Sequence, residues 1–337
     1  MGRVLITVHR ALACALALLA FHPAASWAQA APSTSSGQAY PLKPVRYVVP
    51  FPAGGSPDII ARLIAERFTR MWGQQVLVDN RSGAGGTLGA AFAAKAPADG
   101  YTLFQCNIAS SAIAHSLYAK MPYDHQRDFA PLSRIGLTPN VLVVHPSMPA
   151  RSVKEFIAYA RTHPGKLSYG TSAAGSSQQL SMELFKLTAK VDVVFVPYKG
   201  APQALTDTIG GQIPSSVQSA PGVLPAVEAG RVRALAVTSL KRIAQLPSVP
   251  TLDESALPGF EVNSWYGLCA PAGTPAAILD KVHADLTAVL RTPEIQQRMR
   301  ELVIEVAPTS PQAFGQFMRA ETERWARVIK AAKIAQE

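Results

Sequence analysis

Short apolar runs alternate with amphipathic segments along the first third of the chain. Runs with the length and composition of β-strands occur at residues 45–51, 75–79 and 101–104. Between them, apolar or small residues recur at helical spacing in residues 57–72 and 87–95. The first helix is expected to have Ser56 as its N-cap and to end at Gly73. This β-α-β-α-β order predicts a mostly parallel sheet with helices on both faces.

The same alternation returns in the rest of the chain. Further strands are predicted at residues 140–144, 167–170, 191–196, 213–218, 232–238 and 263–270. Helices are predicted after the capping box of Ser152 and Glu155, after the polar loop 171–177, and over 202–209. Three Ser-Pro or Thr-Pro helix starts follow, and we expect those helices to pack back on the first unit.

The pattern predicts two doubly wound α/β domains. We expect one domain to contain residues 40–142 and 264–337, and the other to contain residues 143–263. Two extended passages, near 140–145 and 262–270, would join them as a two-strand hinge. In open α/β sheets ligands lie beyond the carboxyl ends of the strands, so a ligand site is expected between the two domains.

The N-terminus has the features of a secretory signal peptide. Arg3 and Arg10 belong to a basic start, residues 11–21 are apolar, and Ala28-Gln29-Ala30 is a small-x-small cleavage signal. We therefore expect residues 1–30 to be removed after Ala30, leaving a polar, disordered leader at 31–39. The expected location is the periplasm, and no later apolar stretch is long enough to predict stable membrane insertion.

Composition and charge narrow the function further. The 337 residues are 48% hydrophobic and 16% charged, which is typical of a folded chain. The net charge is +10, but Lys and Arg are scattered, so no nucleic-acid partner is expected. Cys106 and Cys269 could pair after export, but free cysteine is a common small core residue. We expect these two to be buried thiols that do not meet.

Glycine-rich loops are the main candidate chemistry. Residues 54–55, 83–86 and 175–177 each follow a predicted strand and precede a helix, where unpaired N–H groups can bind an anion. The alternative is that they are only tight turns. The chain has no Gly-x-Ser-x-Gly or His-Glu-x-x-His motif, and its histidines lack metal-ligand spacing. We therefore expect no catalytic residue, no metal and no cofactor.

Several motifs stand in an order that resembles one receptor family. They are Tyr40-Pro-x-Lys-Pro-Val-Arg46, Val49-Pro-Phe-x-Ala-Gly-Gly55-x-x-Asp58, Asn80-Arg-x-Gly-Ala-Gly-Gly86, Asp99-Gly-Tyr-Thr-Leu103, Pro197-Tyr-Lys-Gly200 and Ala270-Pro-Ala-Gly-Thr-Pro275. The chain resembles the Bug family of extracytoplasmic solute receptors of tripartite tricarboxylate transporters. The resemblance implies a type II periplasmic binding protein, a small carboxylate ligand held largely by backbone N–H groups and water, and membrane permease subunits as partners. We expect a monomer.

The expected ligand-binding residues combine these loops with neutral polar side chains from both domains. They are Phe51, Ala53, Gly54, Gly55, Asp58, Ala84, Gly85, Ser110, Ser111, Thr171, Ser172, Gly175, Ser176, Ser177, Tyr198 and Gln218. Hydroxyls and amides orient a ligand without a charge that needs compensation when water is excluded.

The chain departs from the family pattern at several of these positions. Ser110-Ser111 stands where the family often has Thr-His, and Gln178-Gln179 stands where it often has Ser-His. Residues 213–218, IPSSVQ, replace a segment that often reads Val-Asp-Leu-Met-Phe-Asp. Gln218 thereby removes an acid, and Pro214 removes a ladder donor. The ligand stays open among aliphatic dicarboxylates, amino acids and aromatic acids.

Two other functions remain as alternatives to a transport receptor. A sensor subunit that presents its ligand occupancy to a membrane kinase would use the same closed form. A secreted α/β enzyme could use the same two-domain scaffold.

Overall fold

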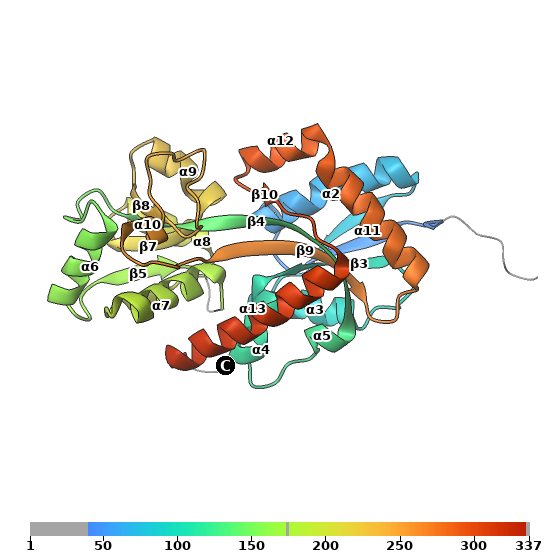
Figure 1. Ribbon diagram of the computed structural model, residues 1–337, viewed down its shortest axis with the longest axis horizontal. Coiled ribbons are helices and arrows are strands. Elements are labelled where there is room, and N and C mark those ends of the chain that lie inside the picture. The colour runs from blue at the N-terminus through green and yellow to red at the C-terminus, as the bar shows by residue number, and fades with distance from the viewer. Residues whose placement is uncertain (1–39, 173–174, 335–337) are drawn as a thin grey trace, which may run out of the picture. The chain divides into compact units, whose positions relative to one another are not determined.

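The computed structural model describes residues 40–172 and 175–334 (Figure 1). The expected signal peptide and leader, residues 1–39, lie outside them. The strands are β1 (Val45–Val49), β2 (Val76–Asn80), β3 (Thr102–Asn107), β4 (Phe129–Val144), β5 (Ser168–Thr171), β6 (Val194–Pro197), β7 (Ser215–Ser219), β8 (Arg233–Val237), β9 (Asn263–Pro271) and β10 (Glu305–Val306). The helices are α2 (Ser56–Trp72), α3 (Thr87–Ala94), α4 (Ala114–Leu117), α5 (His125–Asp128), α6 (Val153–Thr162), α7 (Ser177–Ala189), α8 (Ala201–Ile209), α9 (Ala220–Glu228), α10 (Leu252–Ser255), α11 (Ala276–Arg291), α12 (Pro293–Glu301) and α13 (Pro311–Ala331), together with a 3₁₀ turn, η1 (Ala84–Gly86), and a π-helical segment, η2 (Ala109–Ile113).

The strands form two groups that share β4. In the first group β1 pairs in parallel with β2 and β3, and β9 is antiparallel to β3. In the second group β5 pairs in parallel with β6 and β7. Strand β4 pairs with β9 from Phe129 to Pro139, and with β7 from Asn140 onward. Figure 1 shows β4 and β9 running between the two groups. The predicted α/β class, with two groups of strands and two connecting passages, is confirmed, while the domain limits at 142/143 and 263/264 stay a prediction.

Glycine residues mark both ends of helix α2. Gly55, rather than the expected Ser56, is the N-cap, and Pro57 occupies the first turn. Gly73 ends the helix in the left-handed region at φ 64°, as predicted. The apolar face, including Ile60, Ile64 and Phe68, is buried against the first group of strands and α11. This packing fixes the loop that precedes α2.

The three expected Ser or Thr caps behave differently. Ser310 accepts a hydrogen bond from the Ala313 N–H, whereas the Thr274 and Thr292 hydroxyls donate to preceding carbonyls.

The packing of the long C-terminal helix departs from the sequence prediction. Helix α13 contacts η2, β4 and α4, and it also contacts α7 of the second group. Figure 1 shows it lying along β9. It therefore packs against both groups rather than against the first alone.

Cys106 and Cys269 form a disulfide with a Cα–Cα distance of 6.2 Å, so the expectation of two separate thiols is wrong. The reason is strand pairing, because Cys106 lies opposite Gly267 and Cys269 lies opposite Phe104 in the β3–β9 ladder. The two cysteines are thus diagonal neighbours across an antiparallel pair, and both are fully buried.

His125 couples the stability of this region to pH. Its ring is buried against Phe129, and its Nε2 lies 3.1 Å from the Met318 sulfur of α13. Burial, and secondarily His115, lowers the pKa of His125 to about 3, while Asp124 and Asp128 oppose that shift. The unfolded chain binds a proton near pH 6.5 that the folded chain does not, so stability falls as pH drops below 6.5.

We expect the free energy of unfolding to fall by roughly 1–3 kcal/mol between pH 6.5 and 4.5, measured by urea titration. His125→Gln should reduce that slope, and His163→Gln, at an exposed histidine, should leave it unchanged. Most of this window lies above the range in which the carboxylates of lowered pKa, Asp58, Asp128 and Glu254, would contribute. Burial also lowers the pKa of His115, so His125→Gln should leave part of the slope. An equal slope in wild type and His125→Gln would assign the pH dependence to other groups.

Candidate functional site

The predicted site residues gather where parallel strands end. Strands β1, β2 and β3 end at Val49, Asn80 and Asn107, and β5, β6 and β7 end at Thr171, Pro197 and Ser219. Because parallel strands have their carboxyl ends at one edge of a sheet, each group brings its following loops together. We call these two edges with their loops the strand-end site.

A buried carboxylate holds the first loop, residues 51–55, against α2. Asp58 accepts hydrogen bonds from the Gly54 N–H (2.9 Å), the Arg62 Nε (2.9 Å) and the Asn80 amide (3.0 Å). Burial alone would raise the pKa of the Asp58 carboxyl, but these hydrogen bonds lower it below its usual value. The Asn80 amide also donates to the Phe51 carbonyl. Asp58 and the Gly54 N–H are therefore engaged within the protein, where they shape the loop.

The second loop, residues 83–86, is a 3₁₀ turn made by four successive positive φ angles. Ala84 has φ 45° and Gly85 has φ 62°. A Cβ atom at Gly85 would lie 3.1 Å from the Tyr118 hydroxyl, so this position lies close to another part of the first group. Gly83 and Ala84 are exposed. The Gly86 and Thr87 N–H groups donate to the Gly83 and Ala84 carbonyls. The Ala84 and Gly85 N–H groups have no such partner within the described residues and are available to an anion.

Asn107 organises the third element of this edge. Its side-chain oxygen accepts hydrogen bonds from the Ala109 and Ser110 N–H groups, and its amide donates to the Ser110 hydroxyl. The Tyr123 hydroxyl donates to the Ser110 carbonyl. The Ser111 hydroxyl is buried and has no partner within the described residues. Of the predicted pair, Ser110 is thus used by the protein and Ser111 has an unused hydroxyl.

The second group of strands also has polar side chains of two kinds, some bonded within the protein and some without a partner in the described residues. The Thr171 hydroxyl and the Gln218 Nε2 are buried and have no partner in the described part of the chain. The Tyr198 hydroxyl donates to Asp207 (2.8 Å), and burial, followed by Asp207, raises the pKa of Tyr198 to about 12. The Tyr198 hydroxyl is therefore engaged within the protein, and its ring lies close to Gly170. Ser172 is half-buried directly after β5.

The start of α7 lies against the first group. A Cβ at Gly175 would lie 2.6 Å from the Leu117 side chain in α4, so the two edges meet there. Ser176 caps α7 by accepting the Gln179 N–H. The Ser177 hydroxyl lies 2.5 Å from the Ser264 hydroxyl on β9. Ser177 therefore ties α7 to one of the two connecting passages.

Three residues of this region were not predicted from the sequence. Asn107 follows an apolar run and precedes a helical turn, which is a cap signal that could have identified it. Ser264, and Tyr266, whose hydroxyl shares a hydrogen bond with the Ser56 side chain, come from a strand far along the chain. Nothing local in the sequence reports those contacts.

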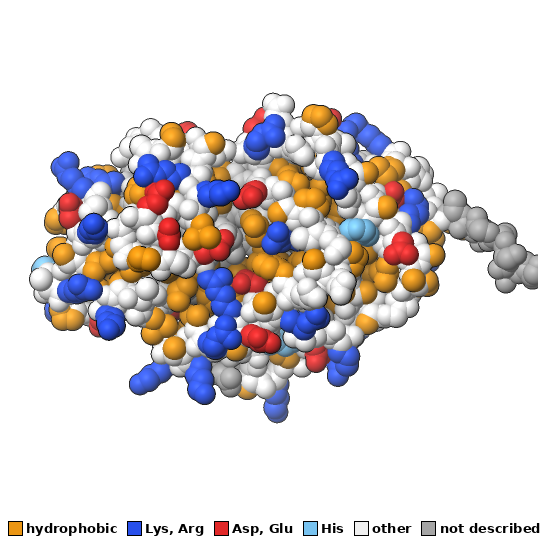
Figure 2. All heavy atoms as spheres, viewed as in Figure 1, with side chains coloured by type: hydrophobic (Ala, Val, Ile, Leu, Met, Phe, Trp, Pro, Cys, Tyr) orange, Lys and Arg blue, Asp and Glu red, His pale blue; other side chains and the backbone are white. Residues whose placement is uncertain are grey.

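Metal and membrane features are absent from the described ranges. No group of three or more His, Cys, Asp or Glu residues is placed to hold a metal ion in residues 40–172 and 175–334. Over the same residues, every helix falls short of the length and apolar character of a transmembrane span. Figure 2 shows Lys and Arg spread over one face among Asp and Glu, rather than gathered in a stripe.

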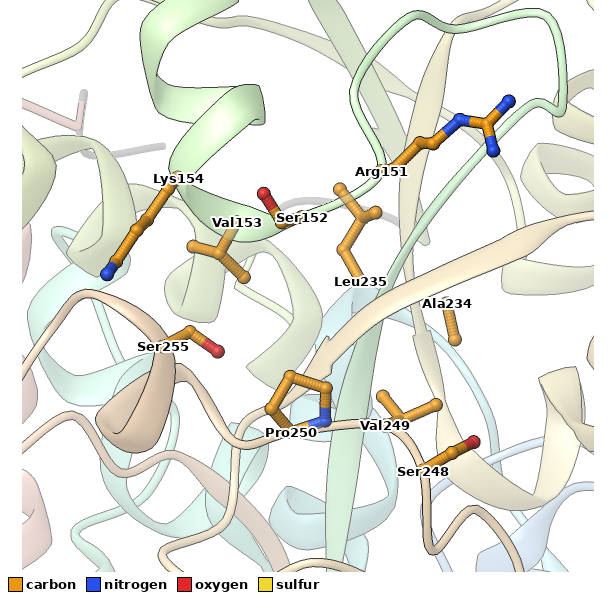
Figure 3. Close-up of a pocket in the computed structure, with 10 residues that line it drawn as sticks. All are labelled: Arg151, Ser152, Val153, Lys154, Ala234, Leu235, Ser248, Val249, Pro250 and Ser255. Atoms are coloured by element: carbon orange, nitrogen blue, oxygen red, sulfur yellow. The ribbon is translucent and has the colours of Figure 1, made fainter.

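A pocket of about 380 Å³ lies away from the strand-end site, between the start of α6, β8 and the turn before α10 (Figure 3). Val153, Leu235 and Val249 supply apolar lining. The charged ends of Arg151 and Lys154 extend away from these side chains (Figure 3). None of the predicted site residues lines this pocket, and we assign it no ligand.

Comparisons with known proteins agree with the architecture. The chain is 39% identical to a UPF0065 protein of Pseudomonas sp. (strain P51), over 86% of this chain and 87% of that protein. It is 34% identical to protein BugT of Bordetella pertussis, over 88% and 91%. A structure of an R. palustris protein with adipate has a TM-score of 0.82 and 40% identity, covering 88% of this chain and all of that one.

A second solved structure, MatC from Rhodopseudomonas palustris with bound malate, has a TM-score of 0.78 and 32% identity, covering 86% of this chain and all of that one. A third, the periplasmic binding protein BugD, has a TM-score of 0.79 and 34% identity, covering 88% of this chain and all of that one, so the expected binding-protein fold is confirmed. The profile of the tripartite tricarboxylate transporter family receptor matches residues 60–334. The chain therefore belongs to the tripartite tricarboxylate transporter receptor family, as its motifs indicated.

Proposed function

We propose that this protein captures a small dicarboxylate at the strand-end site and delivers it to membrane permease subunits. The observation that carries the proposal is that loops from both strand groups converge. The 83–86 loop of the first group has unpaired backbone N–H groups, and each group has buried neutral polar side chains. Structural neighbours with adipate and malate support a carboxylate ligand. The 16 predicted residues are the proposed ligand neighbourhood, with Asp58, Ser110 and Ser177 acting through the loops they hold.

The proposal includes a location and a motion. We propose that residues 1–30 are removed on export and that the mature monomer works in the periplasm. Residues 143–263 would close on residues 40–142 and 264–337 by bending where β4 changes partners at Asn140 and where β9 begins.

Adipate or malate at about 100 times its dissociation constant should stabilise the protein by about 2.7 kcal/mol. We expect this to raise the melting temperature by about 5–10 °C, measured by thermal shift. Gly85→Asp should abolish the shift, because it places a carboxylate in the loop whose N–H groups receive the ligand. Asp is also one of the residues that best tolerates a positive φ.

Gly85→Asn is the matched control, since it has the same shape and backbone demand without the charge. It should melt close to Gly85→Asp in the absence of ligand and retain measurable binding. Equal affinity of wild type and Gly85→Asp would remove this loop from the site. Failure of every mono- and dicarboxylate to shift the melting temperature would refute the proposed function.

A further inference from the structure

The buried carboxylates in the described part of the chain already have cationic partners. Asp58 pairs with Arg62 at 2.9 Å, and Glu183 pairs with Lys186 at 3.0 Å. Glu321 lies 3.4 Å from Arg324. A positively charged ligand group at the strand-end site would therefore find no uncommitted buried carboxylate among the described residues. Burying an ammonium group without a counter-charge is costly.

Acids that are more exposed near the strand ends are committed as well. Asp79, at the end of β2, lies 2.8 Å from the Arg81 Nε and 3.7 Å from the Arg46 Nε. Asp207, in α8, accepts the Tyr198 hydroxyl. Asp79 is therefore neutralised by two arginines, whereas Asp207 keeps its charge and has one oxygen occupied by a neutral hydroxyl.

The unused polar groups at the strand ends are neutral and able to donate. The Gln218 Nε2 is a donor only, and its side chain is 2% exposed. Ser216 lies two residues earlier on β7, so its side chain is on the same face, and its hydroxyl is also unpartnered within the described residues. Ser111 and Thr171 add buried hydroxyls from the two groups. Such a set matches the acceptor oxygens of a second carboxylate.

The Asn140 side-chain oxygen is an unpartnered acceptor in the same region. Its amide, however, donates to the Ser181 hydroxyl at 3.0 Å, which ties the side chain to α7. The Gln105 side-chain oxygen on β3 is likewise buried and has no partner within the described residues. Uncharged amide oxygens do not replace the counter-charge that an ammonium group requires.

We infer that the site selects dicarboxylates that carry no amino group, and that Gln218 is a specificity-determining residue. This inference rests on the proposed function. One carboxylate would take the backbone N–H groups of the 83–86 loop, and the other would take the donors around Gln218. An α-amino group would add a positive charge and N–H donors. The unused hydroxyls could accept those N–H groups but carry no charge to balance them, and the Gln218 Nε2 can only donate.

The direct test uses matched pairs of acids and wild-type protein. Titration calorimetry would compare adipate with 2-aminoadipate, glutarate with glutamate, and succinate with aspartate. Within the pair that binds best, we expect the amino acid to bind at least about tenfold more weakly, because buried donors and an uncompensated charge are left unmatched. Equal or tighter binding of the amino acid would overturn the inference while leaving a carboxylate receptor intact.

Gln218→Glu tests the residue. The added charge should weaken the best dicarboxylate at least about tenfold and move the preference toward its amino analogue by a similar factor. Gln312→Glu, the same charge change at an exposed position in α13, should alter neither value. Gln218→Met removes the donor without adding charge, so it should weaken the dicarboxylate without helping the amino acid. If Gln218→Glu does not fold, Gln218→Met still tests the role of this residue.

If both Gln218 variants keep the wild-type preference for the dicarboxylate over its amino analogue, Gln218 does not determine specificity, even if the wild-type protein selects against the amino group. If none of the six acids binds wild type, the dicarboxylate proposal and this inference fail together. If dicarboxylates bind without selection against the amino group, the inference alone fails.

Discussion

Replacing both Cys106 and Cys269 with serine is expected to lower the free energy of unfolding by about 2–5 kcal/mol. The bond joins residues 163 positions apart and fixes β3 to β9, next to the Asn107 turn that forms part of the site. Its loss enlarges the conformational freedom of the unfolded chain, and two hydroxyls become buried in an apolar core. We expect a melting temperature lower by about 5–15 °C, measured by calorimetry.

Reductant separates the bond from the substitutions. It should lower the melting temperature of wild type and leave the Cys106→Ser, Cys269→Ser double variant unchanged. Thiol titration of the denatured protein should yield two more thiols after reduction than before. Equal thiol counts would show that the bond does not form in the purified protein, and the stability difference would then belong to the serine substitutions.

Most elements of the fold could be predicted because their signals are local. The turn Pro52-Ala53-Gly54-Gly55, the cap at Ser152 and the stop at Gly73 each act over a few residues. The two longest elements that were missed contain proline, whereas α4, α5, α10 and β10 are short and contain none. Helix α9 has Pro225 inside it, and the first part of β4 contains Pro131 at a register shift. Proline usually argues against both kinds of element, and here tertiary packing overrides that preference.

The site was predictable only in part, because sequence patterns place loops but do not show how their groups are already used. The spacing of Asp58 and Arg62 is compatible with an ion pair on one helix, yet the bonds from Gly54 and Asn80 need the folded loop. The same limit applies to Ser177, whose partner Ser264 lies 87 positions away. Unused donors such as the Gln218 Nε2 emerge only once every other contact is known.

Replacing Glu321 with leucine is expected to destabilise the protein by about 2–6 kcal/mol. One oxygen of this buried carboxylate accepts both the Trp265 Nε1 (3.1 Å) and the Trp325 Nε1 (3.0 Å). The contact joins β9, one of the two connecting passages, to α13, and Trp265 also packs edge-on against Phe314. Leucine would fill the space but leave two buried indole N–H groups without an acceptor. Urea unfolding would measure the loss.

Two variants show whether the acceptor causes this loss. Glu321→Gln keeps one acceptor oxygen, so it should recover a large part of the stability that Glu321→Leu removes. Glu323→Leu makes the same substitution two residues further along α13 at an exposed position, and it should change stability by less than about 0.5 kcal/mol. If Glu321→Leu and Glu321→Gln unfold at the same urea concentration, the indole contacts contribute little. The attachment of α13 to β9 would then rest on the packing of Trp265, Phe314 and Trp325 alone, because the two variants differ chiefly in whether an acceptor faces the indoles.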